Sequence, residues 1–155
     1  MSVARKGRQC YKMAMNPIAD FTFLDFRIRR LTFSLNEKFD GKQPQAKVQT
    51  EFKIRHELKQ NRLRVYMNIV FSEKNAPFYI DIEGMSLFDL NRTFNESELE
   101  VLTNNYCSAA MFPYLRETIA DLTRRAGFPP LHIPQVDFSR VFNKKSAENA
   151  IHTLH

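Results

Sequence analysis

Cysteine and glycine are both scarce in this chain, which contains two cysteines and four glycines among its 155 residues. Cys10 and Cys107 have no cysteine neighbours, which excludes a disulfide framework or a zinc ribbon and favours a reducing cytoplasm. The sequence offers no glycine-rich phosphate loop, no nucleophile elbow and no metal-ligand spacing among its four histidines. We therefore expect no cofactor, no metal and no enzymatic activity.

Long apolar runs are missing as well, because no segment approaches the ~20 residues of a membrane-spanning helix. Residues 1–20 contain four cations and no acid before Asp20, and they lack the apolar core and cleavage site of a secretory signal. We expect residues 1–20 to form a flexible basic arm, residues 21–142 a single domain and residues 143–155 a polar tail. No membrane partner is expected.

Charge is unevenly distributed along the chain. Residues 1–64 contain 15 Lys and Arg against 6 Asp and Glu, whereas residues 65–155 contain 8 against 11, within a total net charge of +6. This asymmetry favours an acidic partner or self-association between unlike faces. A nucleic-acid-binding sheet is an alternative, but no aromatic and basic motif of the kind found in RNA-recognition domains supports it, so nucleic acid is not expected.

Alternation of apolar and polar residues predicts strands. Residues 46–58 and 63–71 alternate on either side of a polar turn at residues 59–61, which predicts a β-hairpin. His56 falls on the apolar side of this pattern and is expected to be a core histidine. A further strand is expected from Phe78 past Gly84 to Phe88. These segments predict an antiparallel sheet with one solvated face.

The segment from Phe21 to Leu35 switches phase twice. Phe21 and Phe23 share one phase, Phe26 and Ile28 take the other, and the apolar residues from Leu31 onward return to the first. A phase switch requires a bulge or a bend. We expect both faces of this strand to be apolar, either because the strand is buried at an oligomer interface or because it lines a groove for another chain.

Helices are expected only after the strands. Asn95 and Glu98 have the spacing of a capping box, and the apolar stripe that follows breaks near residues 103–105. A second helix follows Pro113, which either opens it or kinks a longer one, and ends at Gly127. The fold class is therefore α+β, with a four-stranded antiparallel sheet followed by two helices packed on one face.

The most specific string runs from Asn105 to Phe142 and reads NYCSAAMFPYLRETIADLTRRAGFPPLHIPQVDFSRVF. It resembles the C-terminal third of the SecB export chaperones, which carry FPYARE, a helix, RG-F-P-L and PVNF at similar spacings. FRIRRL at Phe26 to Leu31 is similar to the first strand of that family, and Gln43-Pro44 is similar to its crossover loop. The resemblance implies a cytoplasmic holdase chaperone that assembles as a homotetramer, a dimer of dimers, and binds unfolded or extended polypeptide.

A holdase needs exposed apolar surface and free strand edges. The 14 Phe, 5 Tyr and 6 Met of the chain suit contacts with varied clients, because such side chains repack readily. On this reading, the residues expected to contact the client are Phe23, Phe26, Ile28, Phe39, Phe78, Met85, Leu87, Phe88 and Leu131.

Three departures from the family bear on its partner SecA, the export motor. This chain is basic where the export chaperones are acidic, and Lys42 stands where they have a tryptophan. The family's last-strand contact with SecA corresponds to Asp81, with Tyr79 beside it. Its first-strand acids fall on Arg30 and Ser34 in one register, or on Leu35 and Phe39 in another, and neither register restores an acid.

These departures favour a branch of the family that does not depend on SecA. In that branch the chaperone belongs to a toxin–antitoxin–chaperone system and protects the C-terminal segment of the antitoxin. The alternative is a general export chaperone that delivers preproteins to SecA.

Overall fold

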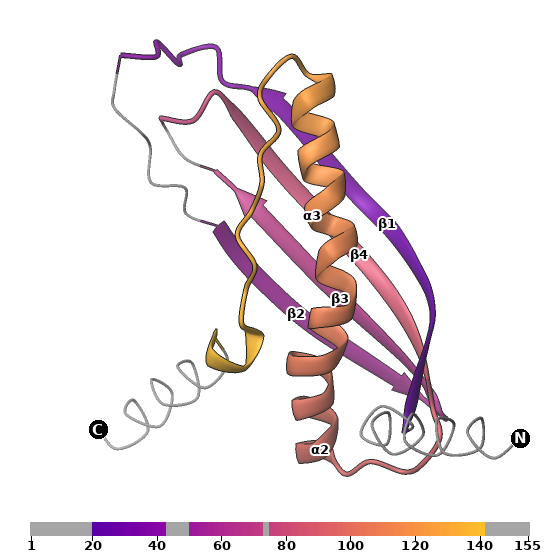
Figure 1. The fold of residues 1–155 in the computed structure, drawn as a ribbon. Coiled ribbons are helices and arrows are strands. Elements are labelled where there is room, and N and C mark those ends of the chain that lie inside the picture. Colours follow the sequence, from indigo (N-terminus) through magenta and orange to yellow (C-terminus); the bar gives the residue numbers. More distant parts are fainter. Residues whose placement is uncertain (1–19, 43–49, 73–74, 142–155) are drawn as a thin grey trace, which may run out of the picture.

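The computed structural model of the protein describes residues 20–42, 50–72 and 75–141. Within them, four strands form one antiparallel sheet in the order β1–β4–β3–β2, and a helical rod lies along one face of the sheet (Figure 1). The strands are β1 (Phe21–Leu35), β2 (Thr50–Lys59), β3 (Arg62–Phe71) and β4 (Phe78–Leu90). The rod consists of α2 (Glu96–Val101), the π-helical turn η2 (Leu102–Cys107) and α3 (Ser108–Arg125). The predicted α+β class is confirmed.

The hairpin of β2 and β3 forms as the alternation predicts. Lys59 pairs with Arg62 across a two-residue turn, in which Gln60 has a φ of 57°. The two strands stay in register over their whole length, from this turn to the pairing of Thr50 with Phe71. Residues 46–49, which the sequence also assigned to the first of these strands, lie outside the described residues.

The core lies between the sheet and the rod. Along β4, every second residue from Phe78 to Leu90 is buried, and the residues between them are only partly buried. The segment after α3 runs back beside α3 on the same face of the sheet (Figure 1). It places Phe138 against Phe52 and Phe112, with ring centroids 6.0 and 5.4 Å away. The side chains that fill the core without exposure include Leu63, Val65, Met67, Ile69, Ile82, Phe88, Met111 and Leu115.

Strand β1 contains the two irregularities that its sequence predicts. Its register against β4 shifts between Phe23 and Asp25 and again between Ile28 and Arg30. The expectation that both faces of β1 would be apolar is wrong, because directly paired residues share a face and the apolar residues of the predicted pattern all pair with the helix-side residues of β4. The two bulges therefore place the apolar residues before, between and after them on the same face of the sheet. Leu24 lies at the first bulge, where the register skips it, and is 43% exposed.

The predicted helices are joined into one rod. The Asn95 side chain accepts from the Glu98 N–H and the Glu98 side chain accepts from the Asn95 N–H, so the capping box is confirmed. At the apolar break the chain stays helical by widening into η2, where the Ser108 hydroxyl donates to the Thr103 carbonyl at 2.9 Å. Pro113 consequently lies inside α3 rather than at its start.

The rod ends at Gly127, as predicted. Gly127 has a φ of 93°, its N–H donates to the Arg124 carbonyl, and the Phe128 N–H donates to the Thr123 carbonyl. This pair of bonds is the Schellman motif, in which a left-handed glycine closes a helix. It turns the chain back over the sheet and so positions the segment that covers β2 and β3.

Candidate functional site

Part of the helix-side face of the sheet has no cover among the described residues. The rod packs on β3 and β4, whereas β1 lies beyond β4 at the edge of the sheet. Ile28, Leu31 and Leu35 of β1 point to the helix side yet remain 40%, 42% and 57% exposed, and we call these three residues the uncovered stripe. The outer edge of β1 pairs with no other described strand. Apolar side chains and free backbone groups thus lie along the same strand.

Aromatic side chains pack the N-terminal half of β1 against the rod. The ring of Tyr114 on α3 stacks on Phe26 at 4.9 Å and on Phe23 at 5.8 Å between centroids. Phe26 lies directly over Gly84 of β4, where an added Cβ would stand 2.8 Å from its ring and 3.0 Å from Leu115. The missing side chain at Gly84 therefore lets Phe26 lie flat on the sheet.

The nine residues expected to contact a client do not gather in one place. Phe23, Phe26 and Ile28 lie along the helix side of β1, and the exposed Phe39 follows β1 in the next loop. Leu131 is partly buried against the core in the segment after α3. Client contact by these five residues remains a prediction.

The other four predicted contacts have different positions. Phe78 and Phe88 are buried in the core, because they occupy helix-side positions of the inner strand β4. In this conformation they support the surface rather than form it. Met85 and Leu87 are partly buried on the opposite, helix-free face of the sheet. A single groove cannot contain all nine residues.

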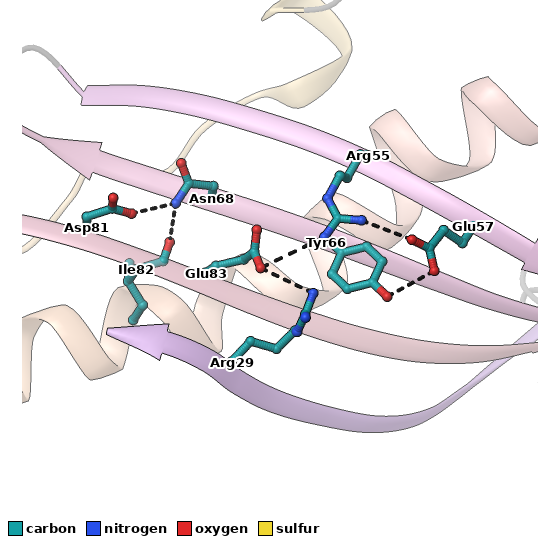
Figure 2. Close-up of polar contacts among 8 residues, drawn as sticks. All are labelled: Arg29, Arg55, Glu57, Tyr66, Asn68, Asp81, Ile82 and Glu83. Carbon is teal, nitrogen blue, oxygen red and sulfur yellow. Dashed lines mark hydrogen bonds and ion pairs between the residues drawn. The ribbon is translucent and has the colours of Figure 1, made fainter. Parts of the chain in front are cut away.

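The helix-free face carries a network of charged residues centred on Tyr66 (Figure 2). The guanidinium carbons of Arg55 and Arg29 lie 3.6 and 5.0 Å from the centre of the Tyr66 ring. The Tyr66 hydroxyl donates to Glu57 at 3.1 Å, and the Glu83 carboxylate lies between the two arginines at 3.4 and 3.9 Å. Arg29 and Arg55, which belong to the basic charge predicted to attract acidic partners, are therefore already paired with carboxylates within the sheet.

Asp81 lies on this face beside a third arginine, Arg30. Arg30 donates to its carboxylate at 2.8 Å and Asn68 at 2.7 Å. Partial burial alone would raise the pKa of Asp81, but the hydrogen bonds from Arg30 and Asn68 outweigh it and hold the pKa below its ordinary value. Arg30 and Ser34 share the face of Asp81 and Tyr79, whereas Leu35 points to the other face. Of the two registers for the family's first-strand acids, the one that falls on Arg30 and Ser34 is therefore the one that places them on the same face as Asp81 and Tyr79.

The pairing of Asp81 predicts a dependence of stability on pH. A carboxyl with a lowered pKa stabilises the fold above its unfolded pKa of ~3.9, and this contribution is lost as the pH falls through the folded value. The Asp81 side chain is 34% exposed, so solvent screening limits the effect to about 0–1 kcal/mol. Asp81→Asn should lower the free energy of unfolding by more at pH 7 than near pH 2, in urea titrations. Glu51→Gln on the same face is the control, and an equal loss at both pH values would contradict this account.

Other features of the described residues offer little catalytic chemistry. Residues 20–42, 50–72 and 75–141 contain no group of three His, Cys, Asp or Glu that could hold a metal ion. Burial raises the pKa of the Cys107 thiol to about 12, which leaves it protonated and unreactive. His56 is exposed, not in the core as expected, because it lies on the edge strand β2. In that same part of the chain, no helix is long and apolar enough to cross a membrane.

Comparisons with known proteins agree on one family. The family model described as preprotein translocase subunit SecB matches residues 28–149. The protein-export proteins SecB of Burkholderia vietnamiensis and Burkholderia multivorans are each 35% identical to the chain over 71 residues, which cover 46% of this chain and 44% of each relative. The match therefore spans less than half the length of these curated relatives.

A solved structure shares the fold. The SecB-like chaperone of Mycobacterium tuberculosis, solved in complex with a ChAD peptide from the HigA1 antitoxin, superposes with a TM-score of 0.67. The alignment covers 83% of this chain and 99% of that one at 21% identity. At 21% identity, this similarity shows that the two proteins share a fold and nothing more.

Proposed function

This chain belongs to the SecB family, and we propose that it is an ATP-independent holdase that binds extended or non-native polypeptide. SecB-family proteins act as chaperones, not as enzymes, and we propose the same for this protein, in the cytoplasm. The observation that carries the proposal is the uncovered stripe on β1, where apolar side chains adjoin a free strand edge. An extended client can bury alternate side chains against such an apolar strand.

The energetics require more than one such surface. Fully burying an apolar side chain gives ~1.5–3 kcal/mol, and the three residues of the stripe are already about half buried. One protomer thus offers only a few kcal/mol, which must also offset the cost of ordering an extended chain. Copies joined side by side would bring several such surfaces within reach of one client and raise its apparent affinity. We therefore propose that the protein works as an oligomer, a tetramer as the family resemblance implies.

The free edge of β1 is the element that we assign to assembly. An unprotected strand edge tends to pair with another strand, and the stripes of two joined protomers would then lie side by side, each partly burying the other and together leaving one wider apolar surface for a client. In that arrangement Phe39, in the loop after β1, would lie at the margin of the contact, where a client can still reach it. The joined sheets would then support client surfaces on both protomers.

For the client, we propose the C-terminal segment of an antitoxin. Two observations support this choice over a general export role. The solved chaperone that shares the fold is in complex with an antitoxin peptide. In this chain, moreover, Asp81 is already bonded to Arg30 and Asn68, so it is a poor acidic contact for SecA. The export role is the second candidate, and the curated relatives named protein-export protein SecB favour it.

A competition distinguishes the two candidates. The full-length protein is titrated by calorimetry with the C-terminal segment of an antitoxin encoded beside it and, separately, with the zinc-bearing C-terminal tail of SecA. We expect binding to the antitoxin segment and at least about tenfold weaker binding to the SecA tail, because the paired Asp81 offers no free anion. Tight binding to the SecA tail and none to the antitoxin segment would establish the export role instead. Binding to neither, with salt-sensitive retention of RNA or DNA, would favour a nucleic-acid module.

A further inference from the structure

The helix-free face of the sheet takes no part in the proposed client site. The rod and the segment after α3 both lie on the opposite face (Figure 1). On the helix-free face, Met85 and Leu87 of β4 stay partly exposed, although β4 is an inner strand of the sheet. The middle of this face therefore offers two apolar side chains over which no described helix packs.

Arginines flank this apolar pair on both sides. Leu87 is paired with Arg64 of β3, and Met85 is paired with Arg27 of β1. Directly paired residues share a face, with Cβ atoms about 5 Å apart. The Arg27 side chain is 74% exposed, and Arg64 is exposed as well. We call these four residues the basic–apolar patch.

Cations outnumber acids around the patch. From the Arg55–Tyr66 pair to the β2–β3 turn, the register places five cations and three acids on the helix-free face: Arg27, Arg55, Lys59, Arg62 and Arg64 against Asp25, Glu57 and Asp89. Each of the three acids is already paired, with Arg27, Arg55 and Arg62 respectively. Arg64 and Lys59 have no ion-pair partner among the residues that the structure describes. This half of the face therefore has positive charge to offer an acidic partner.

The arrangement of the patch specifies the chemistry of that partner. Arg64 and Arg27 lie on either side of β4, roughly 10 Å apart across two strand spacings. About two to four residues of extended chain span that distance, which leaves room for an aliphatic side chain between two carboxylates. A phosphate backbone fits less well, because the three acids on the same half of the face repel it. Tyr66, the aromatic residue on this half, is only 5% exposed beneath Arg55, so no base can stack on it (Figure 2).

We propose that the basic–apolar patch binds an extended acidic segment of a partner polypeptide, in which an aliphatic residue lies between two carboxylates. The carboxylates bind Arg64 and Arg27, and the aliphatic side chain covers Leu87 and Met85. Arg27 has to exchange Asp25 for the partner, but that ion pair is exposed to solvent and costs little to open. Because the patch and the uncovered stripe lie on opposite faces of the sheet, the partner can bind while a client is held.

Fluorescence anisotropy of the labelled peptide GSEDLLDEGS, titrated with the full-length protein at physiological salt, tests this inference without a chaperone assay. Arg27→Gln/Arg64→Gln should weaken binding about tenfold, because it removes both ion pairs. Lys38→Gln/Lys53→Gln removes the same charge from positions outside the patch and should change the affinity by less than about twofold, because salt screens distant charges. All four positions are exposed, so both variants should keep the fold.

Two control peptides and an oligonucleotide complete the test. Replacing the leucines of the peptide with serine, or its acids with their amides, should each weaken binding, because the patch needs both kinds of contact. Equal weakening by the two protein variants would overturn the inference, since it would show only a general attraction between opposite charges. Unchanged binding of the serine peptide, or no binding of the original peptide, would also contradict it. A labelled oligothymidylate that binds more tightly than the peptide, and loses affinity in Arg27→Gln/Arg64→Gln, would show that this face takes nucleic acid instead.

Discussion

Replacing Gly84 with alanine should lower the free energy of unfolding by about 1–3 kcal/mol, because the site has no room for a methyl group. An added Cβ would stand 2.8 Å from the ring of Phe26 and 3.0 Å from Leu115, and neither side chain can move freely. Leu115 is fully buried in the core, and Phe26 is held from above by the ring of Tyr114. We expect the added methyl group to displace the ring of Phe26 from the sheet rather than move Leu115. Urea unfolding followed by circular dichroism measures the loss.

A double-mutant cycle tests the cause of that loss. Phe26→Ala removes the obstructing ring, so Gly84→Ala should cost less in that background, with a coupling energy of at least about 0.5 kcal/mol. Phe23→Ala is the matched control, because its ring stacks on the same Tyr114 but is not among the atoms nearest to an added Cβ at Gly84. Additive losses in the Phe26 pair would show that the close approach to Phe26 does not matter.

The double variant Ile28→Asp/Leu31→Asp should dissociate the proposed assembly into monomers of 18.2 kDa at micromolar concentration. Each side chain has about half of its surface left to bury, which corresponds to ~1 kcal/mol. Losing both contacts weakens association at least about thirtyfold, and burying two carboxylates would weaken it further. Light scattering of the wild type and the variant measures the change. The fold should persist, because both positions are exposed in the single chain.

Ser34→Asp is the control for charge on the same strand. Ser34 is paired with Tyr79 and faces the helix-free side of the sheet. Ser34→Asp should therefore leave the assembly unchanged. A wild type that is itself a clean monomer would contradict the assignment of β1 to assembly. Dissociation by Ser34→Asp to the same extent would instead place the contact on the helix-free face.

Much of the fold follows from local patterns in the sequence. The β2–β3 hairpin was predictable because strict alternation on either side of a short polar turn fixes both the turn and the register. The Asn95 capping box and the glycine at the end of α3 were predictable because each satisfies the free backbone groups at a helix end. The two phase changes in β1 correctly predicted two irregularities in its pairing.

The positions of surfaces were harder to predict, because they depend on strand order. The sequence could not show that both bulges restore the same phase, and so it gave β1 two apolar faces instead of one. Phe78 and Phe88 were predicted to contact a client, but β4 is an inner strand and their side is covered by the rod. The network at Tyr66 was missed for the same reason. The hairpin register alone places Arg55 beside Tyr66, whereas Glu83 joins them through the pairing of β3 with β4 and Arg29 through the pairing of β1 with β4.

The central claim, that exposed apolar surface on β1 lets this protein hold non-native polypeptide, is tested most directly by aggregation of a chemically unfolded client diluted into buffer without nucleotide. Light scattering is followed with the wild type, Ile28→Asp/Leu31→Asp or Ser34→Asp present at equal concentration. We predict that the wild type and Ser34→Asp suppress aggregation at near-stoichiometric ratios and that the double variant loses most of this effect. Equal suppression by all three proteins, or none by the wild type, would contradict the claim.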